Sequence, residues 1–406
     1  MVDYKQTDIG CIPKDWDVKK LGSILQSTQL GGNYPNTESI TKYPLIKMGN
    51  LARGYIDLSK IEYVSNGIIP TYRDKLSYGN VIFNTRNTLD LVGKVSIWRD
   101  ELQSAYFNSN IMRLKFKKQF VSSDFFINNI FNSKNLISQL RNIATGTTSV
   151  AAIYTRDLIN IQIPLPPLKE QEAIAEVLSD ADALITALEK RIAKKRLIKQ
   201  GAMQKLLSPK DDWEVKKLGE VASIIKGKGL PKSALVVEGK YKCIHYGELF
   251  IKYKEKIIEY LSYTDKKDDC FYSKRNDVLM PTSDVTPNGL ATASCVLEDN
   301  VIIGGDILVI RIPENVINGI FLSYSIKKSR EQVMKLVTGS TVYHIYGSDM
   351  ANFVFKYPKI EEQNRIATIL SDIDNEIDAL EKKLAKTKKL KQGLMQQLLT
   401  GKIRLV

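Results

Sequence analysis

The chain has 406 residues, of which 43% are hydrophobic and 26% charged, a balance that excludes wholesale disorder and leaves room for two or more domains with their own cores. Lys and Arg number 59 against 45 Asp and Glu, and the net charge of +14 favours an anionic partner, nucleic acid above all. No run of 18 apolar residues and no secretory signal pattern is present, so we expect a cytoplasmic protein without membrane association.

The first segment of the chain returns later as a near copy. "WDVKKLG" at Trp16 recurs as "WEVKKLG" at Trp213, an offset of 197, and "YPLIKMGNL" at Tyr43 parallels "YKCIHYGEL" at Tyr241. "GNVIFNTRN" at Gly79 corresponds in position to "NDVLMPTSD", and "TGTTS" to "TGSTV". These correspondences indicate two tandem halves.

Each half contains a globular region that the sequence predicts to mix strands and helices. Short β-branched runs bounded by Gly, Asn, Asp or Pro predict strands at 80–84, 94–98, 111–116, 158–165, 277–281 and 306–312. Helical spacing of apolar residues occurs instead at 122–140 and 318–336. The fold class is therefore α/β (α+β), in two pseudo-repeated domains that share a skeleton and differ in surface.

Each half ends in a long predicted helix, and the two helices are the most similar parts of the repeat. Residues 170–207 and 362–399 align without a gap at an offset of 192, with 22 identities in 38 positions. Apolar residues step by 4, 3, 4, 3, 4, the spacing of a coiled-coil seam. The seam residues are Ile174, Leu178, Ala181, Ile185, Leu188 and Ile192, and then Ile366, Leu370, Ile373, Ile377, Leu380 and Leu384.

Because each helix has one narrow seam and the halves are copies, we expect the helices to pair with each other as an antiparallel coiled coil. The alternative is that each helix packs on its own domain or serves homodimerisation. The predicted boundaries are a first domain at 1–168, a helix at 169–208, a second domain at 209–360, and a second helix with the C-terminal tail at 361–406.

Several motifs together resemble the specificity subunit of type I restriction-modification enzymes. They are "IPKDWDVKKLG", "GNVIFNTRNTLDLVGKVSIW", "IPLPPLKEQEAIAEVLSDAD", "EEQNRIATILSDIDNEIDALEKK" and "KQGLMQQLLTGKIRLV", in the family's order over nearly the whole chain. The resemblance implies two target-recognition domains that each read one half of a split sequence in double-stranded DNA. It also implies that the helices set the spacing and dock two methyltransferase subunits, and that motor-nuclease subunits complete the assembly.

Motifs for catalysis and metal binding are not found in the sequence. There is no G-x-x-x-x-G-K-[ST] phosphate loop, no H-E-x-x-H and no Asn/Asp-Pro-Pro-aromatic motif. Four scattered cysteines and two histidines favour reduced thiols over disulfides or zinc. We therefore predict no catalytic, cofactor-binding or metal-binding residue, and the resemblance implies S-adenosylmethionine, ATP and Mg²⁺ on partner subunits.

Polar residues in loops beside strands are the candidate DNA contacts, because bases and phosphates are bound by such side chains and by backbone amides. In the first domain they are Thr85, Arg86, Asn87 and Lys94, with Thr145, Gly146, Thr147 and Thr148. In the second they are Thr282, Ser283 and Asp284, with Thr338, Gly339, Ser340 and Thr341. Weaker candidates are Lys47, Asn50, His245, Tyr246 and Glu248.

Arg86 is the best single candidate, since a guanidinium can bind guanine O6 and N7 together. The corresponding segment of the second half, "PTSD", has no Arg. The candidate loops could instead serve as turns or helix caps without contacting DNA. The Lys-rich helix ends could be solvated helix faces and not sites of phosphate or partner contact. For the whole chain, the alternatives are a coiled-coil scaffold without DNA readout and a self-contained nuclease or methylase.

Overall fold

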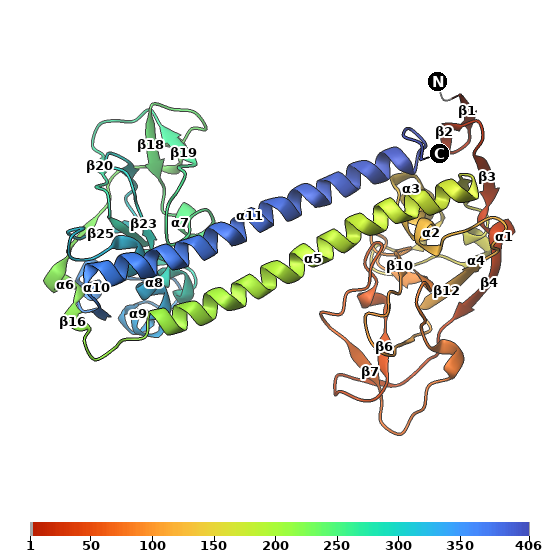
Figure 1. Ribbon diagram of the computed structural model, residues 1–406, viewed down its shortest axis with the longest axis horizontal. Coiled ribbons are helices and arrows are strands. Elements are labelled where there is room, and N and C mark those ends of the chain that lie inside the picture. Colours follow the sequence, from red (N-terminus) through yellow and green to blue (C-terminus); the bar gives the residue numbers. More distant parts are fainter. Residues whose placement is uncertain (1–2, 406) are drawn as a thin grey trace. The chain divides into compact units, whose positions relative to one another are not determined.

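The computed structural model describes residues 3–405 and divides the chain into two compact units. Unit 1 comprises residues 1–189 and 383–406, and unit 2 comprises residues 190–382. The long helices α5 (Leu168–Leu206) and α11 (Ile360–Leu398) each span 39 residues. Each unit therefore contains one globular region, the start of the helix that follows it, and the end of the other helix (Figure 1).

The globular region of unit 1 is built on two four-stranded sheets. The first has the order β10-β8-β12-β4, with bounds Val95–Ile97, Val81–Asn84, Ile111–Phe116 and Leu25–Leu30. All its neighbouring strands are antiparallel. The second has the order β11-β6-β7-β5, with bounds Tyr106–Phe107, Pro44–Ile46, Glu62–Val64 and Asn36–Thr37. Here β11 and β6 are parallel.

Unit 2 repeats this architecture. Its first sheet has the order β23-β21-β25-β17, with bounds Ser294–Cys295, Val278–Pro281, Ile307–Arg311 and Ser223–Lys226. Its second sheet has the order β19-β18-β24-β20, with bounds Ser262–Thr264, Tyr241–Ile244, Ile302–Ile303 and Phe271–Tyr272. The pair β18 and β24 is parallel, as is β6 with β11 in unit 1. The predictions of two similar halves and of an α/β fold in each half are therefore confirmed.

The two predicted helical regions are each divided by a serine. The first forms α2 (Asp124–Phe131) and α3 (Lys134–Ile143), and Ser133 caps α3 by accepting a hydrogen bond from the backbone N–H of Leu136. The second forms α8 (Gly319–Lys328) and α9 (Arg330–Leu336), which meet at Ser329. Helical periodicity continues across each break because the apolar faces of both members of a pair pack on the same core.

The leading strand of each half pairs with the strand that precedes the long helix. In unit 1, β3 (Asp17–Lys20) is antiparallel to β15 (Gln162–Leu165), and in unit 2, β16 (Glu214–Lys217) is antiparallel to β27 (Val354–Tyr357). The strand expected at 158–165 begins only at Gln162, because Leu158 ends the short helix α4 (Thr155–Leu158). In unit 2, the short helix α10 (Gly347–Met350) occupies the position that α4 has in unit 1.

A buried glutamine fixes the first turn of each long helix. Gln171 donates to the backbone oxygens of Phe120 and Pro166 and accepts from the N–H of Ser122. Gln363, 192 residues later, donates to the oxygens of Val316 and Pro358 and accepts from the N–H of Asn318. The same three contacts join the helix to its domain in both units, so these glutamines orient the helix starts.

Each globular core includes residues of both long helices. In unit 1, Ile174 and Leu178 of α5 and Leu398 of α11 are buried with the residues of the first sheet, α2 and α3. In unit 2, Ile366 and Leu370 of α11 are buried with the residues of its first sheet and α8, beside Met203 and Leu206 of α5. The helices thus pack on the domains as well as on each other.

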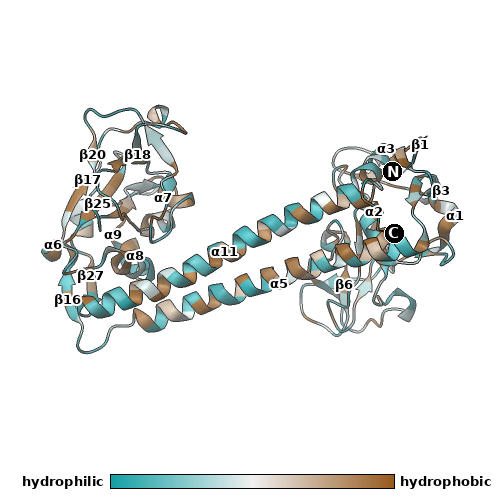
Figure 2. Ribbon diagram, turned by 45° about the horizontal axis from the view of Figure 1, so that its top comes forward, coloured by the Kyte–Doolittle hydropathy of each residue, from teal (hydrophilic) through white to brown (hydrophobic). Residues whose placement is uncertain are grey.

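Ion pairs within each unit show that the helices are antiparallel. In unit 1, Asp182 pairs with Lys391, and Glu189 with Lys388. In unit 2, Lys199 pairs with Asp374, and Lys210, just past α5, with Glu362. Higher residue numbers on the α5 side meet lower ones on α11 in both units, which confirms the predicted antiparallel pairing. Figure 2 shows hydrophobic residues alternating with hydrophilic ones along both helices.

The predicted seam is buried most completely where the helices also contact a globular core. Ile174, Leu178, Leu188 and Ile192 of α5 are buried, and so are Ile366, Leu370 and Ile377 of α11. Leu188 and Ile192 are buried although they belong to neither globular core. The other seam residues are half-buried: Ala181, Ile185, Ile373, Leu380 and Leu384.

Candidate nucleic-acid interface

In unit 1 the two predicted loops form one small sheet. The strands β13 (Thr145–Gly146) and β14 (Ala151–Ala152) make a hairpin from "TGTTSVAA", and β14 also pairs with β9 (Arg86–Asn87). Arg86 lies directly opposite Ala152, and Asn87 opposite Ala151. The structure therefore brings together two candidate segments that are some sixty residues apart in the chain.

Unit 2 builds the same element from its own two predicted loops. Strand β22 (Ser283–Asp284) pairs with β26 (Tyr343–His344), and Thr338 forms a bridge with His344 that closes the hairpin. Ser283 lies opposite His344, and Asp284 opposite Tyr343. In both units a hairpin and a neighbouring short strand form one candidate DNA-contacting element, which we call the reading sheet.

A threonine anchors each reading sheet through the same three hydrogen bonds. Thr85 donates both its backbone N–H and its hydroxyl to the Asn110 oxygen, at 3.1 and 2.9 Å. Its own carbonyl accepts from the N–H of Ile153, at 3.0 Å. In unit 2, Thr282 makes the equivalent bonds to Asp306 and Ile345, at 3.1, 3.1 and 3.0 Å. The hydroxyls of Thr85 and Thr282 are thus committed to holding the sheet in place.

Each hairpin turn requires its glycine. Gly146 has φ +129°, and a Cβ there would lie 2.3 Å from the Val150 oxygen. Gly339 has φ +111°, and a Cβ there would lie 2.2 Å from the Val342 oxygen. Other residues avoid this backbone conformation. Beyond the glycines, the side chains of Thr147, Thr148, Ser340 and Thr341 are exposed. The Thr147 hydroxyl bonds to the Ser149 hydroxyl and accepts from the N–H of Val150 within the turn.

The two faces of each reading sheet differ. Ala151 belongs to the core of unit 1, and Tyr343 packs against the core of unit 2. Since successive residues of a strand point to opposite faces, the neighbours Ala152 and His344 point away from the core, and so do Arg86 and Ser283 directly opposite them. The outward face therefore carries Arg86 in unit 1 and His344 in unit 2.

Asn87 and Asp284 bend the chain after the outward residue. The side-chain oxygen of Asn87 accepts from the N–H of Thr88 at 2.9 Å, and that of Asp284 accepts from the N–H of Val285 at 2.7 Å. Asp284 also accepts from the hydroxyl of Thr286 at 2.8 Å. The two bonds from backbone N–H groups are local side-chain-to-backbone contacts of the kind found in turns.

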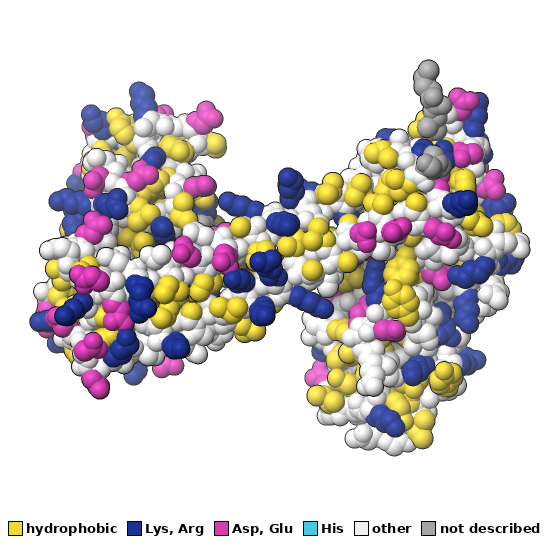
Figure 3. All heavy atoms as spheres, in the orientation of Figure 1, with side chains coloured by type: hydrophobic (Ala, Val, Ile, Leu, Met, Phe, Trp, Pro, Cys, Tyr) yellow, Lys and Arg dark blue, Asp and Glu magenta, His cyan; other side chains and the backbone are white. Residues whose placement is uncertain are grey.

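Unit 1 gathers mutually repelling cations near Lys94. Burial, and next the charge of Arg53, lower the pKa of Lys94 below its ordinary value. Burial, and next Arg141, likewise lower the pKa of Arg53. An anion bound beside these groups would reduce their repulsion, which is consistent with a phosphate contact. Figure 3 shows Lys and Arg side chains on both units and along the helices, with Asp and Glu among them.

The weaker candidates are mostly engaged inside their domains. Asn50 is buried and accepts from the N–H of Lys47. Glu248, 198 residues later, is buried and accepts from the N–H of His245. The ammonium of Lys47 pairs with Glu62 at 2.8 Å. The ring of Tyr246 packs between those of His245 and Phe250, at centroid distances of 4.8 and 6.4 Å.

Two exposed tyrosines follow the hairpins and are not among the candidates predicted from the sequence. Tyr154 is 46% exposed and Tyr346, 192 residues later, is 56% exposed. Arg156 lies over the Tyr154 ring, and the His344 ring is stacked on that of Tyr346. The signal that could have found them is the repeat itself, which aligns "IYTRDL" with "IYGSDM" at the offset of the long helices.

Among residues 3–405, no cluster of three His, Cys, Asp or Glu side chains is placed to hold a metal ion. None of the helices in this described part is both long and apolar enough to cross a bilayer. Cys11, Cys243, Cys270 and Cys295 are all free; Cys243 and Cys295 are buried, and Cys11 is exposed.

Comparison with known proteins identifies the family of this duplicated fold. The family described as "Type I restriction modification DNA specificity domain" matches residues 13–197 and again residues 210–391. The chain belongs to this family. The two matches coincide with the two halves of the internal repeat, so each half is one specificity domain.

Full-length relatives of this specificity-domain chain occur in Methanocaldococcus jannaschii. The MjaX type I restriction enzyme specificity subunit is 27% identical, and the alignment covers 99% of this chain and 97% of the relative. The MjaVIII specificity subunit is 26% identical, with 97% and 94% covered. In fold, the chain is similar to the crystal structure of the type I restriction-modification S subunit from M. genitalium, with a TM-score of 0.64, 16% identity and coverage of 94% and 96%.

Proposed function

We propose that this chain is the DNA-specificity subunit of a type I restriction-modification complex. Each unit reads one half of a bipartite site in double-stranded DNA through its reading sheet. The paired helices set the spacing between the half-sites and dock two methyltransferase subunits, while motor-nuclease subunits complete the restriction complex. The observation that carries the proposal is the repeated reading sheet, which has one backbone plan and different outward side chains in the two units.

The divergence of the outward side chains supports two different half-sites. Arg86 and Ala152 of unit 1 are replaced by Ser283 and His344 in unit 2, while the threonine anchors and turn glycines are retained. A scaffold that only joined proteins would not require different polar groups at one position of a retained frame. Sequence-specific readout requires such differences, because each base pair presents its own donors and acceptors.

We assign catalysis to the partner subunits. Methyl transfer requires S-adenosylmethionine, and DNA translocation and cleavage require ATP and Mg²⁺, so these bind elsewhere in the complex. The buried thiols of this chain are poor nucleophiles, because burial raises the pKa of Cys243 to about 12. The purified chain alone is expected to neither methylate nor cleave DNA.

The deciding experiment is the adenine methylation pattern of the native strain, read by single-molecule sequencing with this gene intact, deleted and restored. Loss of one split motif on deletion, and its return on restoration, is the expected result. A motif that persists without the gene would refute the assignment. As a complement, the complex reconstituted with its methyltransferase subunits should retain duplexes that carry that motif in preference to duplexes with either half-site scrambled.

A further inference from the structure

One cross-strand pair of residues differs between the two reading sheets, because the larger side chain of the pair lies on a different strand in each unit. In unit 1 the pair is Arg86 on β9 and Ala152 on β14. In unit 2 the same pair is Ser283 on β22 and His344 on β26. Each unit thus has one long nitrogen-bearing side chain and one small residue at this position, but the long side chain comes from opposite strands.

The retained frame places the two pairs alike. The strand that carries Arg86 or Ser283 follows the anchoring threonine directly, and the strand that carries Ala152 or His344 precedes the isoleucine that bonds to this threonine. Directly opposite residues of an antiparallel pair share a face and lie about 5 Å apart at Cβ. A side chain from either strand therefore projects from nearly the same point of the outward face.

We propose that this pair is the base-reading position of each unit, occupied by Arg86 in unit 1 and by His344 in unit 2. The inference rests on the proposed function and names the residues that determine specificity within it. It also assigns unit 2 a reader, although its "PTSD" segment contains no Arg. The small partners Ala152 and Ser283 leave space on the outward face for a base edge.

Both side chains have donors available for a ligand. Among residues 3–405, the hydrogen bonds of Arg86 and His344 are made by their backbones, and no side-chain hydrogen bond or ion pair engages the guanidinium of Arg86 or the ring nitrogens of His344. The His344 ring lies nearly parallel to that of Tyr346, with 6.1 Å between the ring centroids and an interplanar angle of 18°. The two aromatic rings therefore lie side by side near the hairpin.

The chemistry of the two groups predicts the bases they contact. A guanidinium binds guanine O6 and N7 as a bidentate donor, so the half-site of unit 1 contains a guanine that depends on Arg86. An imidazole N–H donates one hydrogen bond, which N7 of either purine, guanine O6 or thymine O4 can accept in the major groove. One base pair in the half-site of unit 2 therefore depends on His344 through an acceptor on its major-groove edge.

The test uses the full chain assembled with its methyltransferase subunits and a pool of DNA duplexes with randomised sequence, selected by binding and sequenced. For His344→Ala we expect preference at one position of one half-site to fall on the order of 10- to 100-fold, with all other positions unchanged. For Arg86→Ala we expect the same at a guanine of the other half-site. His344→Gln and Arg86→Gln should shift the preferred base toward adenine, since an amide pairs with adenine N6 and N7.

The control in unit 2 is Glu331→Ala, which removes an exposed side chain of α9, outside the reading sheet, and should leave base preference unchanged at every position. The Gln variants guard against a folding defect in the Ala variants, because a shifted preference requires a folded protein. If the wild-type complex selects no motif, the proposed function fails. If the wild-type complex selects a split motif and the His344 and Arg86 variants select the same motif, the inference is overturned. It is also overturned if these variants lose affinity for all sequences by the same factor.

Discussion

Lys199 of α5 forms an ion pair with Asp374 of α11, with 2.8 Å between Nζ and a carboxylate oxygen. In unit 1, Lys391 of α11 and Asp182 of α5 form the same pair at 2.5 Å, with the two helices in exchanged roles. Each member lies 192 residues from its counterpart. A second pair follows the same rule, because Arg196 with Glu381 is repeated as Lys388 with Glu189. These pairs fix the register of the antiparallel helices in both units, since a shift of one helix would separate them.

Removal of Lys199 should destabilise unit 2. Asp374 and Glu255 are both buried, and Lys199 contacts both of them. Lys199→Ala is expected to cost about 3 kcal/mol in the free energy of unfolding, because it leaves buried carboxylates with less compensation. The measurement is unfolding by urea, followed by circular dichroism. The exposed Lys210→Ala, which breaks a surface ion pair with Glu362, should cost about 0.5 kcal/mol. Equal effects for the two substitutions would contradict this account.

The stability of unit 2 should fall in acid because of Glu255. Burial alone would raise the pKa of Glu255, but Lys327 and Lys199 together lower it below its ordinary value of 4.5. A carboxyl group with a lowered pKa in the folded state stabilises the protein fully above the unfolded pKa, and loses this contribution as the pH falls through the folded pKa. Unfolding midpoints measured at a series of pH values below 4.5 should therefore decrease less steeply in Glu255→Gln than in the wild type. Parallel curves would rule out this role for Glu255.

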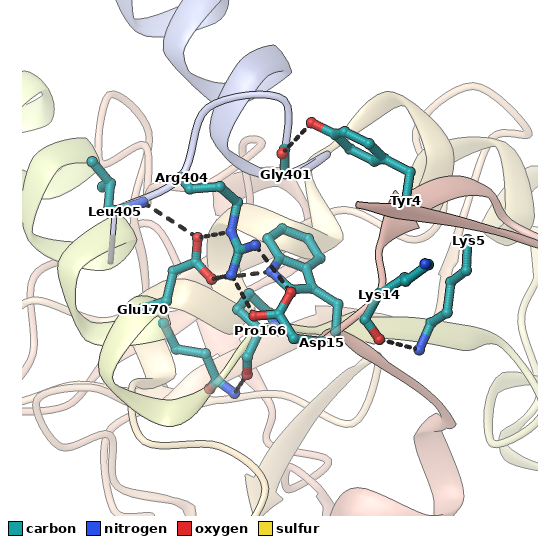
Figure 4. Close-up of polar contacts among 11 residues, drawn as sticks. Tyr4, Lys5, Lys14, Asp15, Pro166, Glu170, Gly401, Arg404 and Leu405 are labelled. Atoms are coloured by element: carbon teal, nitrogen blue, oxygen red, sulfur yellow. Dashed lines mark hydrogen bonds and ion pairs between the residues drawn. The ribbon is translucent and has the colours of Figure 1, made fainter. Parts of the chain in front are cut away.

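Arg404 should hold the C-terminal tail on the first domain. Its guanidinium donates to Glu170 at 2.7 and 2.9 Å and to Asp15 at 3.0 and 2.6 Å, and Glu170 also accepts from the indole N–H of Trp16 (Figure 4). Glu170 is only 1% exposed, so Arg404→Ala leaves a buried carboxylate without its cation. We expect a loss of about 3 to 5 kcal/mol and faster hydrogen exchange of the tail amides.

Arg404→Lys provides the graded comparison for that substitution. An ammonium group keeps the charge but cannot reproduce the planar fork that bonds two carboxylates, so an intermediate loss is expected. Arg365→Ala is the matched control in unit 2, because Arg365 is exposed and lies 3.8 Å from Glu362. Unaltered exchange of the tail amides in Arg404→Ala would show that the apolar contacts of the tail suffice to hold it.

Substitution of the turn glycines should weaken DNA binding more than global stability. Gly146→Ala and Gly339→Ala each place a Cβ against a backbone oxygen, in a backbone conformation that costs a non-glycine residue on the order of 1–3 kcal/mol. Because the hairpin is exposed, it can rearrange to relieve this strain without unfolding the domain. Binding to the cognate duplex, measured by fluorescence anisotropy on the reconstituted complex, should fall by about 10-fold or more. Gly201→Ala, on α5 with no atom within 4 Å of its Cβ, is the control and should leave binding unchanged. Equal affinities for all three variants would exclude the hairpins from the interface.

The sequence by itself determined the duplication, the antiparallel helices and the family resemblance. These features are readable because a constant offset of 192 residues and a seam of apolar residues are local patterns that need no knowledge of distant contacts. The sequence also located both segments of each reading sheet through their Gly, Thr and Asn residues. It singled out Arg86 for its guanidinium, but it could not show that the hydroxyl of the neighbouring Thr85 is bound to the Asn110 oxygen while the Arg86 side chain points outward.

Only the tertiary structure decided which residues share a position on the outward face. Arg86 and His344 do not align in the repeat, because one precedes and the other follows a stretch of some sixty residues that folds back to pair the strands. The register of that pairing is set by the anchoring threonines, by burial of Ala151 and by packing of the partly buried Tyr343 on its core, which are long-range contacts. A shift of one residue would turn each outward side chain into the core, so the partner strand, and not the local sequence, fixes the face.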